Sequence, residues 1–329
     1  MFFNSMIIST LITISSYNWL MMWIGLEINL LSIIPLFKSH TNSFPVEASL
    51  KYFITQSLAS IIILFSMILS MNLMEYLNNW NYSLMIMFNS ALLTKLGAAP
   101  FHYWFPEVME GLNWMNSLLL LTWQKLAPMI LLMYNLNMSM FFSIIIILSS
   151  ITSGMFGINQ ISLRKILSYS SINHIAWMLA SMFYMKSIWI IYFSIYTMIS
   201  INIILIFYYL NTFFIPQLFL ILNNNKLIKI LFIFNFFSLG GLPPFLGFFP
   251  KWLVINNLVE NKFYTLSFIL ITTTLITLFY YIRLTLSTLT LNFSESVFIL
   301  SYVNNFKIMF FNICSILSLI IYLNIFSYF

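Results

Sequence analysis

Apolar segments of about 20 residues follow one another along almost the whole chain. A helix of this length crosses about 30 Å of hydrocarbon, so each segment predicts a membrane-spanning helix. The composition agrees, because 61% of the 329 residues are apolar and 6% are charged, against roughly 25% charged in soluble domains. The chain is therefore predicted to be an all-α, polytopic membrane protein.

Apolar runs and helix breakers divide the chain into about eleven spans. Polar connections between them are too short for a soluble domain. No basic segment with a small-residue cleavage site precedes the first span, so we expect insertion without cleavage. The spans lie near residues 3–19, 20–37, 50–74, 82–104, 112–134, 139–158, 162–182, 187–210, 228–249, 263–285 and 307–327.

The basic residues of the loops are distributed unevenly over the two membrane sides that these spans define. With the N-terminus inside, eight basic residues fall on the inner side and two, Lys186 and Lys262, on the outer side. Because orientation follows Lys and Arg in short loops, this predicts an inner N-terminus and an outer C-terminus. The eight are Lys38, Lys51, Arg164, Lys165, Lys226, Lys229, Arg283 and Lys307.

Four ionisable residues are predicted at membrane depth: Glu27, Lys95, Lys125 and Lys251. A charge at the centre of the bilayer costs at least about 2.5–3.5 kcal/mol, so such residues usually mark an ion path. The alternative is a set of static structural pairs, although buried pairs stabilise less than apolar packing does.

Two of these lysines adjoin helix breakers. Lys95 begins the segment KLGAAPFHYWFPEV, and Lys251 ends the segment GGLPPFLGFFPK. Glycine and proline at this density predict unwound backbone. Within a bilayer, unwound backbone is tolerated only where protein buries it or where it lines a watery cavity. Both lysines are therefore expected to meet water.

The broken segment is about fourth in each of two sets of five spans. Because five is odd, the sets must have opposite topology, which is the inverted-repeat plan of secondary transporters. We predict two inverted five-helix repeats with broken helices, over residues 1–135 and 136–285, and a C-terminal loop and transmembrane helix over 286–329.

Two histidines are further candidates for proton transfer. His174 is mid-span among hydroxyl side chains in SYSSINHIAWM, and His102 adjoins the first break. Histidine titrates near neutral pH, but each is equally readable as a satisfied core residue. The single cysteine, Cys314, excludes disulfides, iron–sulfur ligation and cysteine zinc sites within this chain. We expect no redox cofactor and no metal here, and no nucleic-acid binding, because the basic residues are scattered between apolar spans.

Six segments in order, from about residue 20 to 255, resemble a known family. They are WIGLEINLLSIIP, EASLKYFITQSLAS, KLGAAPFHYWFPEV, LLTWQKLAP, LRKILSYSSINHIAWM and SLGGLPPFLGFFPKW. They resemble the antiporter-like membrane subunits of mitochondrial NADH:ubiquinone oxidoreductase, respiratory complex I, in the short animal form. The Met-, Asn- and Ile-rich composition is similar to that of arthropod mitochondrial products.

The resemblance implies a proton-translocating subunit in the mitochondrial inner membrane, with its N-terminus in the matrix and its C-terminus in the intermembrane space. By motif, Glu27, Lys95, Lys125 and Lys251 match ionisable positions of the family, and His102 and His174 also match family positions. The resemblance also implies that NADH, FMN, iron–sulfur clusters and ubiquinone belong to partner subunits. The implied partners are other membrane-arm subunits, including neighbouring antiporter-like chains, and membrane lipids.

The mechanism expected from these residues is a lateral chain along the membrane midplane. Glu27 is expected to pair with Lys95, and Lys125 and Lys251 to continue the chain. At about 4 Å and an effective dielectric constant near 20, a carboxylate attracts an ammonium group by about 4 kcal/mol. Opening the pair would therefore favour proton release. A structural scaffold subunit of the same complex and a stand-alone ion transporter remain alternatives.

Overall fold

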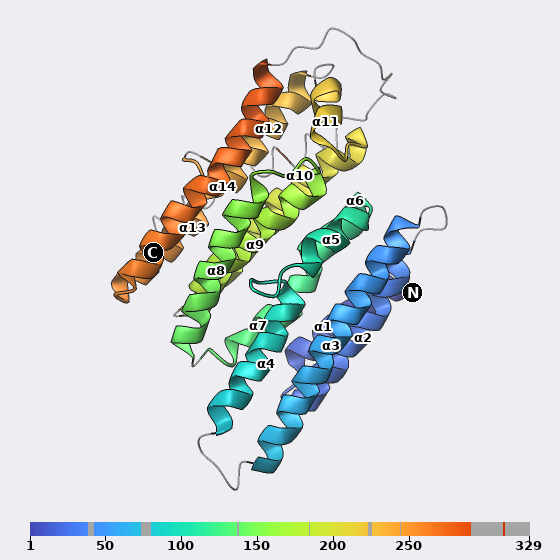
Figure 1. Cartoon of the computed structure of the whole chain (residues 1–329), viewed down its shortest axis with the longest axis vertical. Helices are drawn as coiled ribbons and strands as arrows, with labels where there is room; N and C mark the ends of the chain where they lie inside the picture. The colour runs from blue at the N-terminus through green and yellow to red at the C-terminus, as the bar shows by residue number, and fades with distance from the viewer. Residues whose placement is uncertain are drawn as a thin grey trace. The chain divides into compact units, whose positions relative to one another are not determined.

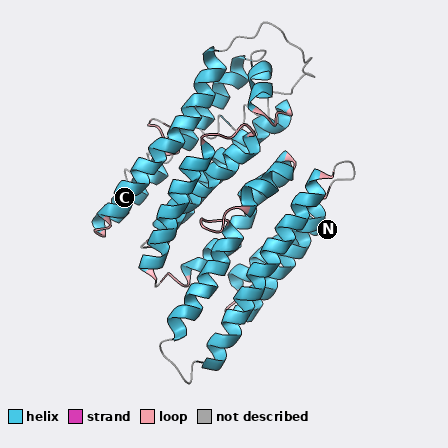
Figure 2. Cartoon of the chain, viewed as in Figure 1, coloured by secondary structure: helices cyan, strands magenta, loops and turns pink. Residues whose placement is uncertain are grey.

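A computed structural model of the chain describes residues 1–38, 43–73, 80–136, 138–183, 185–222, 226–243, 245–290 and 312. Throughout this part the secondary structure is helical, apart from an isolated bridge between Ser162 and Phe214 (Figure 2). The predicted all-α class is therefore confirmed. The predicted span 307–327, and most of the segment 286–329, lie outside the described residues.

The chain divides into two compact units, Met1–Leu148 and Ser149–Phe329. The boundary falls inside one helix, α8, and not at the predicted repeat boundary between residues 135 and 136. Compact packing and internal repetition are different properties, so the two repeats remain a prediction.

The first unit is a bundle in which one long helix runs beside a broken one. The long helix is α3, which packs against both α4 and α5. Next to it, α2 packs between α1 and α3, while α7 contacts α1 and α4 (Figure 1). The helices are α1 (Phe2–Ser15), α2 (Trp19–Phe37), α3 (Phe44–Leu73), α4 (Trp80–Leu96), α5 (Trp104–Gly111), α6 (Trp114–Leu121), α7 (Trp123–Met133) and the start of α8 (Ser139–Gly157).

In the second unit too, a long helix packs against both halves of a broken helix. Here α10 packs against α12 and α13, and also against α9, while α14 packs against α9, α12 and α13. The helices after α8 are α9 (Leu163–Met182), α10 (Lys186–Leu210), α11 (Ile215–Leu222), α12 (Lys226–Gly240), α13 (Phe248–Glu260) and α14 (Tyr264–Thr290).

Within the described residues, six helical stretches are long and apolar enough to cross a membrane. The predicted spans 82–104 and 228–249 are each interrupted, and the short helices α5, α11 and α13 were not predicted. The broken and short helices do not reach spanning length by themselves, and α9 is long enough but not apolar enough to be counted. The total of about eleven spans therefore stays a prediction. The six stretches are α2, α3 over Phe44–Met71, α6 with α7 over Trp114–Met133, α8, α10 and α14.

The first break begins where α4 ends. Gly97 has a φ of 75°, a left-handed conformation that glycine adopts without steric cost. The amides of Gly97 and Ala98 both donate to the carbonyl of Leu93, at 3.0 and 3.1 Å. This pattern satisfies the last carbonyls of a helix and turns the chain away from its axis. The predicted unwinding after Lys95 is therefore confirmed.

The second break repeats this pattern at the end of α12. Gly241 has a φ of 77°. The amides of Gly241 and Leu242 both donate to the carbonyl of Phe237, at 3.1 and 3.2 Å. Helix α13 then begins at Phe248 and carries Lys251. Lys95 thus precedes its break, whereas Lys251 follows its own.

Candidate functional site

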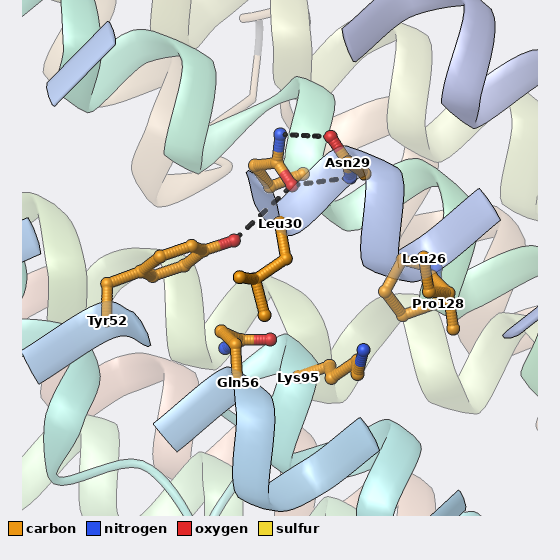
Figure 3. A pocket seen from close by; sticks show the side chains of 8 residues that line it. Leu26, Asn29, Leu30, Tyr52, Gln56, Lys95 and Pro128 are labelled. Atoms are coloured by element: carbon orange, nitrogen blue, oxygen red, sulfur yellow. Dashed lines mark hydrogen bonds between the residues drawn. The ribbon is translucent and has the colours of Figure 1, made fainter. Parts of the chain in front are cut away.

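Lys95 lies in the last turn of α4, and the residue is only 8% exposed. It faces a cavity of about 10 Å³, close to the smallest volume that holds one water molecule. Figure 3 shows side chains converging on this cavity from several helices. The lining residues are Leu26, Asn29 and Leu30 of α2, Tyr52 and Gln56 of α3, Lys95 of α4, and Gln124 and Pro128 of α7.

Asn29 and Gln124 form a reciprocal amide pair at this cavity. Asn29 Nδ2 donates to Gln124 Oε1 at 2.8 Å, and Gln124 Nε2 donates to Asn29 Oδ1 at 3.1 Å. The hydroxyl of Tyr52 donates to the same Gln124 oxygen at 3.5 Å (Figure 3). The Asn29 amide is buried and needs such partners. The hydrogen-bonded set joins α2, α3 and α7 beside Lys95.

Gln56 and Lys95, unlike the amide pair, each have a side-chain nitrogen without a hydrogen-bond partner among the described residues. Gln56 Nε2 is buried and has no hydrogen-bond partner among the described residues. In the same part of the chain, Lys95 makes no hydrogen bond and no ion pair. Both groups are donors on the cavity wall, and an unmet buried donor costs about 1–3 kcal/mol or more. The cavity can therefore offer one water molecule two protein donors.

Glu27 does not line this cavity. Leu26, Asn29 and Leu30 form the cavity face of α2, and adjacent helical residues point about 100° apart. Glu27 is partly exposed, and its Oε1 is buried without a hydrogen-bond partner in the described part of the chain. Its charge acts on Lys95 at longer range.

The expected direct ion pair between Glu27 and Lys95 is therefore not formed. Lys51 forms ion pairs with Glu47 and Glu107, each at 3.0 Å, whereas neither Glu27 nor Lys95 forms an ion pair with a described residue. The expectation failed because it considered only the depth of each residue in the membrane and not the direction in which its helix face points.

Lys125 lies in the first turn of α7 and is 2% exposed. Its Nζ is 5.7 Å from the ring centroid of Phe105, on α5. Phe105 also packs against the first break, since a Cβ at Gly97 would lie 3.2 Å from Phe105 Cβ. A cation over a phenyl ring gains about 0.5–2 kcal/mol. One aromatic ring therefore connects the first break to Lys125.

Lys251 is held by the end of α12. Its Nζ donates to the carbonyl of Gly240 at 2.8 Å and lies 3.5 Å from the carbonyl of Leu239. The same nitrogen is 5.9 Å from the ring centroid of Trp177, on α9. The carbonyl end of a helix carries a partial negative charge, so this site stabilises an ammonium group without a carboxylate.

The two histidines have different surroundings. His174 on α9 is 5% exposed, and its Nδ1 is 2.9 Å from the hydroxyl of Tyr192. His102 is 2% exposed, stacks on Tyr103 with 4.5 Å between ring centroids, and hydrogen-bonds the backbone of Pro100. His102 is not among the residues lining the cavity.

Each unit thus contains its own part of the candidate set. The first holds Glu27, Lys95, Lys125 and His102, and the second holds Lys251 and His174.

Sequence reasoning missed the neutral polar residues Asn29, Gln56 and Gln124. Each of them is an amide side chain within an apolar run, which could have drawn attention to it. Asn29 comes two residues after Glu27, and Gln124 directly precedes Lys125. The described residues contain no cluster of three His, Cys, Asp or Glu side chains that could hold a metal ion.

Known proteins share both the sequence and the fold. Residues 16–277 match the family described as "NADH:quinone oxidoreductase/Mrp antiporter, TM". NADH-ubiquinone oxidoreductase chain 2 of Anopheles gambiae is 49% identical over 313 residues, which cover 93% of this chain and 89% of that protein. The protein of the same name from Locusta migratoria is 44% identical over 303 residues, covering 92% and 88%. A chain of respiratory complex I from Thermus thermophilus, solved with bound aureothin, has the same fold with a TM-score of 0.86, at 20% identity, over 96% of this chain and 75% of that one.

The chain therefore belongs to the NADH:quinone oxidoreductase/Mrp antiporter transmembrane family. Within this family its homologues are NADH-ubiquinone oxidoreductase chain 2, a subunit of the complex I oxidoreductase. The resemblance carried by the six sequence motifs is confirmed.

Proposed function

We propose that this chain translocates protons in the membrane arm of NADH–ubiquinone oxidoreductase, in the mitochondrial inner membrane, through Glu27, Lys95, Lys125 and Lys251. The observation that carries the proposal is the environment of Lys95. This lysine lies at a helix break, faces a polar cavity with room for about one water, and has no carboxylate in direct contact within the described residues. A static structural lysine would instead be paired.

The proton steps follow from the cost of a buried charge. Low-dielectric surroundings disfavour an ammonium group, and a nearby carboxylate favours it. Small movements of Glu27 relative to Lys95 therefore change how tightly Lys95 holds its proton. A water in the cavity provides the acceptor, and α7, which packs against α4, carries the next lysine, Lys125. Lys251, held by the carbonyl of Gly240, is the second unit's member of the chain.

The two inverted repeats are part of the same proposal. Two observations support them: the breaks after α4 and α12 have matching amide-to-carbonyl patterns, and a long helix, α3 or α10, packs against both halves of each broken helix. The lysines are not equivalent within this scheme, because Lys95 precedes its break and Lys251 follows its own. We place the N-terminus on the matrix side and the C-terminus on the intermembrane-space side, following the distribution of basic residues.

Redox chemistry is assigned to partner subunits. NADH, FMN, iron–sulfur clusters and ubiquinone are expected there, and this chain is expected to contact neighbouring antiporter-like chains and lipids. Its own residues hold and move protons, and the energy for the cycle reaches it from those partners.

The test is the number of protons pumped per NADH oxidised by sealed vesicles carrying Lys125→Met, after a native gel has shown full assembly. The matched control is Lys38→Met, which changes an exposed lysine of the same unit. A lower ratio for Lys125→Met, with Lys38→Met unchanged, supports the relay. An unchanged ratio for Lys125→Met would favour the scaffold alternative, and ion transport by the isolated chain would favour the stand-alone transporter.

A further inference from the structure

The two breaks have the same internal spacing. Helices α5 and α13 each begin seven residues after the glycine of their break, at 104 after 97 and at 248 after 241. Four positions between these points and shortly after them are identical in sequence: Pro100 and Pro244, Phe101 and Phe245, Phe105 and Phe249, and Pro106 and Pro250. With this alignment, Glu107 occupies the position in the first unit that Lys251 occupies in the second, ten residues after the glycine (97 to 107 and 241 to 251).

Each break is bridged by a side-chain hydrogen bond from its second helix to its first. In the second unit, Lys251 Nζ donates to the carbonyl of Gly240 at 2.8 Å. Glu107 cannot replace it, because an ionised carboxylate only accepts hydrogen bonds. The donor of the first unit is instead Trp104, three residues earlier on the same face of α5, whose Nε1 donates to the carbonyl of Thr94 at 3.0 Å. A neutral indole thus bridges the first break, and an ionisable amine bridges the second.

Trp104 contacts both the helical turn that carries Lys95 and the wall of the cavity that Lys95 faces. Thr94 directly precedes Lys95, and its carbonyl also accepts from the amide of Gly97 at 3.2 Å. The Trp104 ring lies edge-on to the ring of Tyr52, with 5.7 Å between the centroids. Tyr52 lines the Lys95 cavity (Figure 3). A movement of the indole would therefore displace the last turn of α4 relative to this wall.

The helix that carries Trp104 is itself attached to α3. Glu107 Oε2 lies 3.0 Å from Lys51 Nζ, although a half-exposed ion pair contributes little by itself. The closer contact is at Gly111, the last residue of α5, where a Cβ would lie 2.7 Å from that of Ala48. Because α3 is continuous over 30 residues, it provides a fixed support for Trp104.

We propose that Trp104 is a positioning residue for Lys95, which keeps the last turn of α4 in place while Lys95 gains and loses its proton. The inference rests on the proposed function of Lys95. The indole N–H is a donor only and does not titrate in the physiological range, so this bridge is the same in both charge states of Lys95. The bridge of the second break differs, because a hydrogen bond from a charged donor is roughly twice as strong as a neutral one and its donor is Lys251 itself.

Trp104→Phe in the complete complex tests this role, because it removes the indole donor and keeps an aromatic ring. The matched control is Trp19→Phe, which makes the same change at a partly exposed indole of the same unit that forms no hydrogen bond with the described residues. Assembly is checked by native gel, and the protons pumped per NADH are measured in sealed vesicles as a function of pH. Both variants retain the titratable side chains of the other cavity-lining helices, α2, α3 and α7: Glu27, Glu47, Lys51, Tyr52 and Lys125.

We expect Trp104→Phe to move the pH at which the pumping ratio falls to half by about 0.5–1 unit, which is the net free energy of one hydrogen bond expressed in pH units. Trp19→Phe should leave this pH unchanged. A packing defect alone would reduce the amount of assembled complex without moving the profile. An unmoved profile in assembled Trp104→Phe would overturn the proposal.

Lys95→Met, measured in parallel, separates this inference from the proposed function. If Lys95→Met lowers the pumping ratio while Trp104→Phe behaves as Trp19→Phe does, the positioning role is wrong and the relay stands. If Lys95→Met pumps normally, the proposed function fails and the positioning role fails with it.

Gly111→Ala provides a second test should Trp104→Phe not assemble. Its Cβ would push α5 away from Ala48 and so displace the indole without removing its N–H group. A moved pH profile in assembled Gly111→Ala supports the positioning role, and a normal profile would overturn it.

Discussion

The ammonium nitrogen of Lys251 lies 2.8 Å from the carbonyl oxygen of Gly240, the last residue of α12. Lys251 itself is on α13, so this hydrogen bond crosses the second break and joins its two helical halves. Hydrogen bonds from a charged donor are roughly twice as strong as neutral ones. The geometry of the break is therefore coupled to the charge on Lys251.

Lys251→Met should lower the number of protons pumped per NADH. The change removes both the proposed proton carrier and the donor that satisfies the Gly240 carbonyl. The measurement is the pumping ratio in sealed vesicles, with Lys226→Met as the control at the exposed start of α12. A normal ratio for Lys251→Met would remove this residue from the relay.

Gly241→Ala should destabilise the second break by about 1–2 kcal/mol, because a side chain in the left-handed region is strained. The added Cβ would also lie 2.8 Å from Lys251 Cδ and 2.9 Å from its Nζ. Gly240→Ala is the matched control, since its Cβ would have its nearest neighbour at 3.5 Å. Thermal unfolding of the assembled complex should distinguish the two, and equal stabilities would contradict the strain argument.

Asn29→Leu should cost about 1–3 kcal/mol of stability, because it leaves the partly buried Gln124 Nε2 without its acceptor. The double variant Asn29→Leu/Gln124→Leu should cost less than the sum of the single changes, since the two residues form one interaction. The measurements are the extent of assembly and the loss of thermal stability of each variant complex. Strict additivity would mean that the reciprocal amide pair contributes no interaction energy.

Phe105→Leu should weaken the stabilisation of charged Lys125 by about 0.5–2 kcal/mol. Combining it with Lys125→Met separates this effect from lost packing, because the ring has no cation to stabilise in the Lys125→Met background. The thermal unfolding cost of Phe105→Leu should therefore be smaller in that background. The same cost in both backgrounds would exclude a cation–π contribution.

The helical class and both breaks could be predicted from the sequence because they have local causes. The length of each apolar run follows from bilayer thickness, and Gly97 and Gly241 stand where the structure needs a positive φ. Short helices such as α11 were missed, since eight residues are too few to give a spanning signal.

The arrangement around the candidate residues was less predictable. The depth of Glu27 and Lys95 in their helices could be estimated from the rise per residue. Their missing direct contact could not, because it depends on how α2 is rotated about its axis. The partners of Asn29 and Gln56 likewise depend on how α2, α3 and α7 pack, and helix packing involves residues far apart in sequence.

The reciprocal pair of Asn29 and Gln124 has a consequence for any cycle in which Lys95 and Lys125 change charge. Amide side chains do not gain or lose protons near neutral pH, so this contact between α2 and α7 has the same composition in every protonation state. Gln124 precedes Lys125 directly, and Asn29 shares the cavity wall with Lys95. In such a cycle, the pair would hold α2 and α7 together next to both lysines, whichever of the two lysines carries the proton.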